Sequence, residues 1–168
     1  MDNHYRFEWT DNSSEAIARQ IHAVQMSAYA QEAKLLGAIY FPPLSRTVDD
    51  IRNCQETFFA AFISNQLVGA ISTLPDPEGM GTNIATLVVA PSMQRKGIAK
   101  LLIQEVLSQC DSASLTVQTG VKNVPALNLY YQHGFIEVRR WLVGHEPLEL
   151  VKLRRSPMFD SQVSANAV

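Results

Sequence analysis

The chain has 168 residues, 46% of them hydrophobic and 18% charged, with 14 basic against 16 acidic residues and a formal net charge of −2. This length indicates one domain with a core large enough to be stable without disulfides or a bound metal. The net charge disfavours a nucleic-acid-binding protein. No apolar run approaches the roughly 20 residues of a membrane span, and residues 1–4 lack the features of a signal peptide, so we expect a cytoplasmic protein.

The first half of the chain predicts two helices and four strands. The pattern Asn12-x-x-Glu15 predicts a capping box at the start of a long helix. That helix would carry an apolar stripe of Ile17, Ile21, Val24 and Ala28. The expected elements are a strand over 5–10, the long helix ending near Gly37, a short helix over 49–55, hairpin strands over 58–63 and 67–74, and a strand over 84–90.

The second half alternates helices with strands, which favours a mixed α/β sheet. The expected elements are a helix over 97–110, a strand over 114–119, a short helix after Asn123, and strands over 136–143 and 148–153. We expect residues 1–155 to form a single domain and residues 156–168, which are poor in apolar side chains, to be a disordered tail. Cys54 and Cys110 have no metal-ligand spacing and are predicted to be buried free thiols.

Residues 88–100 predict an anion-binding site. An apolar strand stops at Pro91 and passes through a basic, glycine-containing loop into a helix, whose unpaired N–H groups and dipole attract anions. Gly97 would let an oxygen approach the backbone. No Gly-x-x-x-x-Gly-Lys-[Ser/Thr] motif is present, and no Gly-x-Gly-x-x-Gly follows a strand. We therefore expect a diphosphate held by backbone amides without a metal, with an ordinary strand-loop-helix connection as the alternative.

Residues 123–135 predict a short helix with Asn123 as its cap, Pro125 in its first turn and Gly134 just past its end. Asn123, Ala126 and Tyr130 would share one face. Together, residues 94–99 and 123–135 resemble the GNAT superfamily of acyl-CoA-dependent N-acyltransferases. The first segment matches the pyrophosphate loop [Gln/Arg]-x-x-Gly-x-[Gly/Ala], and the second matches Asn-x-x-Ala-x-x-Leu-Tyr-x-x-x-Gly-Phe. The resemblance covers residues 57–143.

The resemblance implies a mostly antiparallel sheet of about seven strands with flanking helices. Two parallel strands, ending at Val89 and near Thr119, would splay apart and form a cleft for acetyl-CoA. The pantetheine arm would pair with the exposed edge of the first strand like a short strand, and an amide there would stabilise the oxyanion. The residues implied to bind acetyl-CoA are Leu87, Val88, Val89, Gln94, Arg95, Lys96, Gly97, Ile98, Ala99, Lys100 and Asn123.

In this family the acceptor amine attacks the thioester directly. Tyr130 matches the general acid that protonates the departing thiolate, with a core aromatic as the alternative. Many members carry a carboxylate base where this chain has Gln118 or the run Ile84-Ala85-Thr86. The base is therefore water or another group. The candidates are Glu32, Glu137, His145 and Glu146, of which we favour the His145-Glu146 pair in the bend between the last two strands.

Acceptor specificity is expected from residues 29–44 and 143–148, which match the family least. The predicted acceptor-binding residues are Tyr29, Tyr40 and Phe41 as an aromatic wall, Glu32 as the partner of a cationic amine, and His145 and Glu146. The implied function is acetyl transfer from acetyl-CoA to a primary amine of a small molecule or a peptide N-terminus. We expect no nucleic-acid or membrane partner, and a homodimer stays open. The alternative is a catalytically inactive acyl-CoA-binding module.

Overall fold

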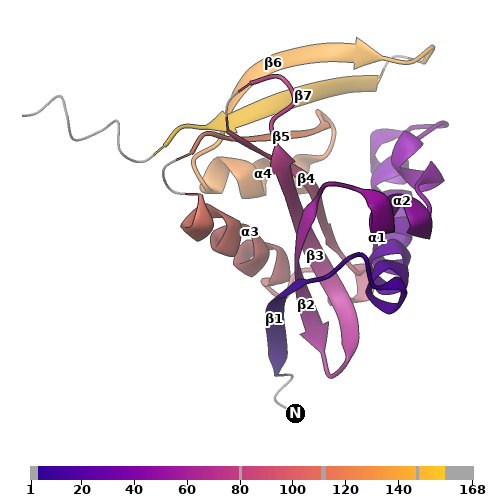
Figure 1. The fold of residues 1–168 in the computed structure, drawn as a ribbon. Helices are drawn as coiled ribbons and strands as arrows, with labels where there is room; N and C mark the ends of the chain where they lie inside the picture. The colour runs from indigo at the N-terminus through magenta and orange to yellow at the C-terminus, as the bar shows by residue number, and fades with distance from the viewer. Residues whose placement is uncertain (1–3, 80, 111–112, 147, 158–168) are drawn as a thin grey trace, which may run out of the picture.

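The computed structural model describes residues 4–79, 81–110, 113–146 and 148–157 (Figure 1). The strands are β1 (Tyr5–Thr10), β2 (Thr57–Ile63), β3 (Gln66–Pro75), β4 (Thr82–Val89), β5 (Leu115–Gly120), β6 (Ile136–Val143) and β7 (Leu148–Arg155). The helices are α1 (Glu15–Leu36), α2 (Val48–Asn53), α3 (Ile98–Gln109) and α4 (Val124–Gln132), with 3-10 turns η1 (Pro42–Ser45) and η2 (Pro91–Met93). Most of the tail predicted over 156–168 lies outside the described residues.

The seven strands form one sheet in the order β1-β2-β3-β4-β5-β7-β6. Each neighbouring pair is antiparallel except β4 and β5, which are parallel. Their pairing covers three register positions, the last of which joins Ile84 to Val117, although β4 continues to Val89 and β5 to Gly120. The mixed, mostly antiparallel sheet with a splayed parallel pair is therefore confirmed.

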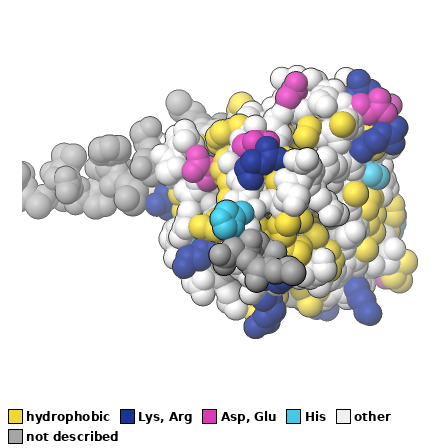
Figure 2. Space-filling view, turned by 90° about the horizontal axis from the view of Figure 1, so that it is seen from below, with side chains coloured by type: hydrophobic (Ala, Val, Ile, Leu, Met, Phe, Trp, Pro, Cys, Tyr) yellow, Lys and Arg dark blue, Asp and Glu magenta, His cyan; other side chains and the backbone are white. Residues whose placement is uncertain are grey.

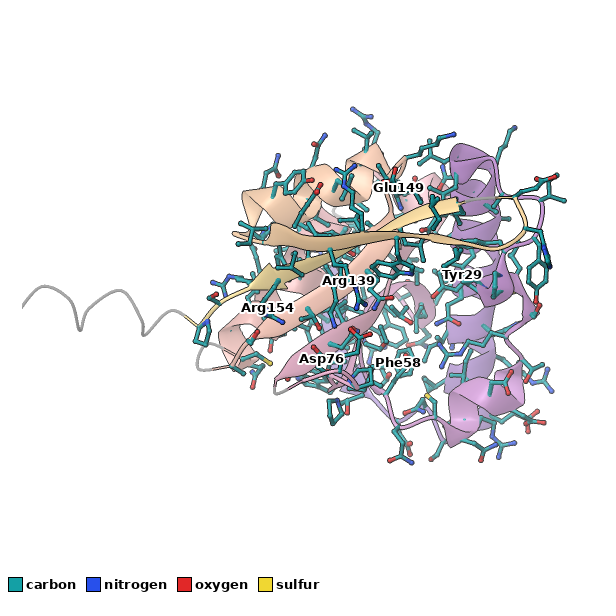
Figure 3. The ribbon with its side chains drawn as sticks, turned by 90° about the horizontal axis from the view of Figure 1, so that it is seen from above. Tyr29, Phe58, Asp76, Arg139, Glu149 and Arg154 are labelled. Carbon is teal, nitrogen blue, oxygen red and sulfur yellow. The ribbon has the colours of Figure 1, made fainter. Side chains whose placement is uncertain are left out.

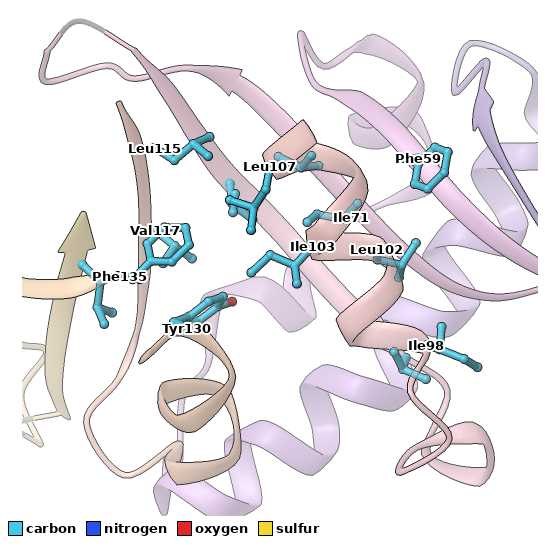
Figure 4. Packing of buried hydrophobic residues seen from close by; sticks show 14 of the residues in the cluster. Phe59, Ile71, Ile98, Leu102, Ile103, Leu107, Leu115, Val117, Tyr130 and Phe135 are labelled. Carbon is cyan, nitrogen blue, oxygen red and sulfur yellow. The ribbon is translucent and has the colours of Figure 1, made fainter. Parts of the chain in front are cut away.

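Helices cover both faces of the sheet, with α1 and α2 on one face and α3 on the other (Figure 1). On the first face Ile21 and Ile51 pack with Phe58 and Phe62, all at most 2% exposed. Full burial of one such side chain stabilises the fold by about 2 kcal/mol. On the other face, the apolar stripe of α3 packs against β2, β3 and β4 around Ile71 (Figure 4). These two layers hold α1 and α3 on either side of the splayed strands.

The capping box predicted at Asn12 and Glu15 is wrong. Helix α1 has Ser14 as its N-cap, without a side-chain hydrogen bond. Asn12 instead donates its Nδ2 hydrogen to the Ile51 carbonyl at 2.6 Å, and so ties the start of α1 to α2. A capping box does form at α2, where Thr47 and the residue three positions later exchange hydrogen bonds.

Other local differences are smaller. Of the predicted α1 stripe, Ile21 and Val24 are buried, but Ile17 and Ala28 are half-buried. Both cysteines are free, as predicted, but half-buried rather than buried. Both 3-10 turns begin at a proline, which hydrophobic periodicity does not detect. None of the helices in the described part of the chain is long and apolar enough to cross a membrane.

Seen from below, most of the acidic side chains lie in the upper half of the face, and the basic side chains are spaced around it with uncharged surface between them (Figure 2). This face therefore offers no continuous basic surface.

Candidate active site

A cleft of about 930 Å³ opens where β4 and β5 diverge. Its walls come from the second half of α1, the end of β4, the loop into α3, the first turn of α3, and one face of α4. The lining residues are Ala28, Gln31, Glu32, Lys34, Leu35, Leu87, Val88, Val89, Met93, Gln94, Arg95, Gly97, Ile98, Ala99, Lys100, Asn123, Pro125, Ala126, Leu129 and Tyr130. The cleft thus brings together the two motifs and a stretch of α1.

The loop into α3 presents a row of free amides. In the described structure, the N–H groups of residues 95–100 donate to no acceptor, and the first bond of α3 runs from Leu101 N to Gly97 O at 3.1 Å. Gly97 and Arg95 have φ angles of +82° and +61°, which turn the backbone into the helix. Arg95 and Lys100 line the cleft, but Lys96 is exposed and does not. This geometry suits a phosphorylated ligand.

Gln94 has a different place from its neighbours. Its N–H donates to Pro91 O at 3.4 Å, so the row of free amides begins one residue later. Its side-chain Nε2 donates to Gln31 Oε1 at 2.7 Å and to Val89 O at 3.2 Å. Gln94 therefore fastens the loop to α1 and to the end of β4.

Asn123 and Tyr130 project from α4 toward the same cleft. Asn123 caps the helix by accepting from Ala126 N at 3.3 Å, and its Nδ2 donates to Thr119 Oγ1 at 3.3 Å. The Tyr130 ring is 5% exposed and packs 5.6 Å from the Phe135 ring, while its hydroxyl points away from Phe135 (Figure 4). Tyr130 is thus a core aromatic that also lines the cleft.

Two ionisable groups of the cleft, Tyr130 and Glu32, have pKa values shifted by their surroundings. Burial, the Glu32 charge and Tyr29 raise the pKa of Tyr130 well above its usual range. Burial also raises the pKa of Glu32, although a hydrogen bond from Asn123 lowers it in part. Tyr130 is therefore kept protonated, and the charged form of Glu32 is disfavoured.

Of the six residues predicted to bind the acceptor, Glu32 lines the cleft. Tyr29 packs edge-on against Phe41 at 6.2 Å between ring centroids. Tyr40 is 76% exposed, and His145 and Glu146 are exposed. These five side chains do not line the cleft, so the structure places the favoured base pair, His145-Glu146, away from it.

Glu137 is held on the surface. Its carboxylate binds Arg140 at 2.8 Å and accepts the Tyr131 hydroxyl at 2.5 Å. These two partners lower the pKa of Glu137, and it does not line the cleft. Its partner Tyr131 is 43% exposed.

A model of the Acetyltransferase (GNAT) family matches residues 19–135 of the chain. The chain belongs to the GNAT acetyltransferase family. The match confirms the resemblance inferred from the two motifs and extends it back into α1.

A sequence relative of the GNAT chain is "UPF0157 protein YqkA" of Bacillus subtilis (strain 168), 36% identical over 129 residues. The match covers 76% of this chain and 37% of YqkA, so the chain spans little more than a third of that relative's length.

Solved structures share the fold of the GNAT chain. The ribosomal-protein-S18-alanine N-acetyltransferase from Escherichia coli has a TM-score of 0.71 at 12% identity, covering 95% of this chain and 99% of its own. PaiA N-acetyltransferase from Thermoplasma acidophilum, in complex with coenzyme A, has a TM-score of 0.68 at 14% identity, with 91% and 99% covered. YncA, a putative acetyltransferase from Salmonella typhimurium with acetyl-CoA, has a TM-score of 0.70 at 12% identity, with 91% and 94% covered.

The GNAT chain also has a polar cluster beneath α1 that sequence reasoning missed. Glu56 binds Arg46 at 2.6 Å and accepts the Ser72 hydroxyl at 2.5 Å and the Thr86 hydroxyl at 3.4 Å. Gln25 Nε2 donates to Thr86 Oγ1 at 3.2 Å. The single hydroxyl residues Ser72 and Thr86 within apolar strands hint at a buried polar cluster. The sequence could not reveal the cluster, because the partners of these hydroxyls come from other parts of the chain.

Among the described residues, no group of three or more His, Cys, Asp or Glu side chains could hold a metal ion.

Proposed function

We propose that this GNAT protein transfers the acetyl group of acetyl-CoA to a primary amine by direct attack while both substrates are bound. The observation that carries the proposal is the cleft itself. It joins the free amides of residues 95–100, the unpaired edge of β4 beyond Ile84 and the Tyr130 hydroxyl in one space.

The loop residues fit a diphosphate. A Cβ added at Gly97 would meet no atom within 4 Å, so space is open in front of the backbone there. Arg95 and Lys100 have no ion-pair partner within the described residues and can balance the phosphate charges. The helix dipole of α3 adds to the same attraction.

The splayed edge of β4 suits the amide-rich pantetheine arm. An edge strand offers unpaired N–H and C=O groups, and a ligand amide can replace the missing strand partner. An N–H of residues 87–89 would also donate to the thioester oxygen, a bond that strengthens as negative charge develops there. Tyr130 would then protonate the leaving thiolate, since it holds its proton at neutral pH.

The acceptor is a primary amine of a small molecule or a peptide N-terminus. An ammonium group entering the cleft would meet the Glu32 carboxylate. The E. coli neighbour is named for an alanine of ribosomal protein S18, which supports including a peptide among the acceptors tested.

A thiol-release assay tests the proposal. Purified protein and acetyl-CoA are mixed with spermidine, glucosamine, free lysine or a short peptide with a free N-terminal alanine. We expect release above the hydrolysis background with at least one amine, and an acetylated product by mass spectrometry. No release with any amine, together with no binding of CoA, would reject the proposal. CoA binding without turnover would indicate the inactive acyl-CoA-binding module instead.

A further inference from the structure

Glu32 is the one acidic side chain among the described residues that line the cleft. It lies on α1, half-buried, and Asn123 lines the same cleft. Tyr130 lines the same space, close enough for the Glu32 charge to act on its hydroxyl. A carboxylate and a buried phenol thus occupy one cleft.

The carboxylate has no cation of its own. The other charged or titratable groups around it are Tyr29 and Lys34 of α1, Arg95 of the loop, Lys100 of α3 and Tyr130 of α4. Within the described residues none of these cations forms an ion pair with Glu32.

Two shielded carboxylates of the chain hold a cation. The pairs are Glu56 with Arg46 at 2.6 Å and Asp76 with Lys152 at 3.4 Å. A half-buried carboxylate without such a partner costs folding free energy. Glu105 is also half-buried without a cation, but it lies outside the cleft. Glu32 lines the cleft, so its missing partner points to a cation that arrives with the ligand.

We propose that Glu32 is the group that takes the proton from the acceptor ammonium in the cleft. The proposal rests on the proposed acetyl transfer and names a further catalytic residue for it. Because Gln118 and Ile84-Ala85-Thr86 leave the neighbouring strands without a carboxylate, α1 supplies the base from the facing wall.

The protons balance as follows. The ammonium gives one proton to a Glu32 carboxylate oxygen, and the freed nitrogen lone pair forms the C–N bond to the thioester carbon. The C–S bond breaks with its electron pair on sulfur, which takes the Tyr130 proton. The second nitrogen proton returns to Tyr130, and Glu32 releases its proton to solvent, so the products are the amide, CoA thiol and one proton.

The environments of the two residues agree with these roles. Burial shifts the pKa of Glu32 upward, toward the range in which a carboxylate accepts a proton effectively. Burial and the Glu32 charge raise the pKa of Tyr130. Tyr130 therefore stays protonated and can donate a proton, while Glu32 can accept one.

The test is the pH dependence of Glu32→Gln, measured with acetyl-CoA and the best amine of the thiol-release panel. At pH 7 we expect kcat/KM for the amine to fall about 100-fold. The loss should shrink as the pH approaches the pKa of the amine, which then arrives already deprotonated. Glu32→Asp should recover part of the rate, and the acetyl-CoA Kd should stay within about two-fold of wild type.

Glu105→Gln is the matched control, because Glu105 lies on α3 outside the cleft and binds Gln109. It should keep the wild-type profile. Wild-type rates in Glu32→Gln, or a loss of equal size at every pH, would overturn the assignment of Glu32. If the wild type itself acetylates no amine, the proposed function fails rather than the role of this residue.

Discussion

Tyr130 keeps its proton across neutral and alkaline pH, because burial and the Glu32 charge raise its pKa. Its own ionisation should therefore cause no loss of rate up to about pH 10. In Tyr130→Phe the ring stays packed on Phe135, but the proton donor is removed. We expect kcat to fall at least about 10-fold, with acetyl-CoA affinity nearly unchanged by calorimetry.

Tyr131→Phe is the control for Tyr130→Phe, since the Tyr131 hydroxyl binds Glu137 on the surface. It should leave kcat unchanged. An equal kcat in Tyr130→Phe and wild type would assign protonation of the thiolate to water or another group.

Single residues differ in how far the sequence could predict them. Tyr130, Asn123 and Gly97 carry the motifs, and the structure brings them to one cleft. Glu32 was one of several acidic candidates, and its lack of a cation partner became visible only in three dimensions. His145, favoured by its place near a bend, lies outside the cleft, because a bend in the chain does not fix where its hairpin points.

At the scale of elements, the buried carboxylate of Asp76, labelled in Figure 3, links the segment after β3 to β5 and β7. Lys152 of β7 lies 3.4 Å from Asp76 and 2.7 Å from Glu78, and Thr116 of β5 donates to Asp76 at 3.0 Å. Burial raises the pKa of Asp76, but hydrogen bonds from Glu78 N–H, Thr116 and Lys152 outweigh it, and the net shift is downward. Ionised Asp76 therefore stabilises the fold above its unfolded-state pKa.

Asp76→Asn should lower the free energy of unfolding by about 1–3 kcal/mol at pH 7, as measured by urea unfolding. The stabilisation from Asp76 is lost as the pH falls through its folded-state pKa, so the difference from wild type should narrow below about pH 4. Asp49→Asn, at an exposed pair with Arg52, should change little at either pH. Two results would contradict this account: an unfolding free energy of Asp76→Asn equal to that of wild type at pH 7, or a destabilisation as large in acid as at pH 7.

Periodicity predicted the type of each helix and strand because apolar faces repeat along them. It failed where a side chain found a distant partner. Asn12 has the spacing of a capping box, but the Ile51 carbonyl, 39 residues away, takes its hydrogen bond. A pattern of neighbouring residues cannot reveal a hydrogen-bond partner so far away in the chain.

At the scale of the whole molecule, the mostly antiparallel sheet and the splay of its parallel pair came from the resemblance rather than from residue patterns, and the strand order came from the structure. No local sequence pattern indicates that β4 and β5 stop pairing after Ile84. A Cβ at Gly120 would lie 2.4 Å from a Leu36 methyl, so α1 closes directly onto the end of β5. That contact places Glu32 opposite α4. This placement follows from tertiary packing and cannot be predicted from a short stretch of sequence.

The most direct test is a calorimetric titration of CoA into wild type, Gly97→Asp and Gly97→Asn. Asp and Asn have the same shape and both tolerate the left-handed conformation of residue 97, so the two variants differ in charge. We expect saturable binding to wild type and at least about ten-fold weaker binding to Gly97→Asp than to Gly97→Asn, which corresponds to about 1.4 kcal/mol. Folded wild type that binds no CoA, or equal affinity of the two variants, would contradict a diphosphate site at the start of α3.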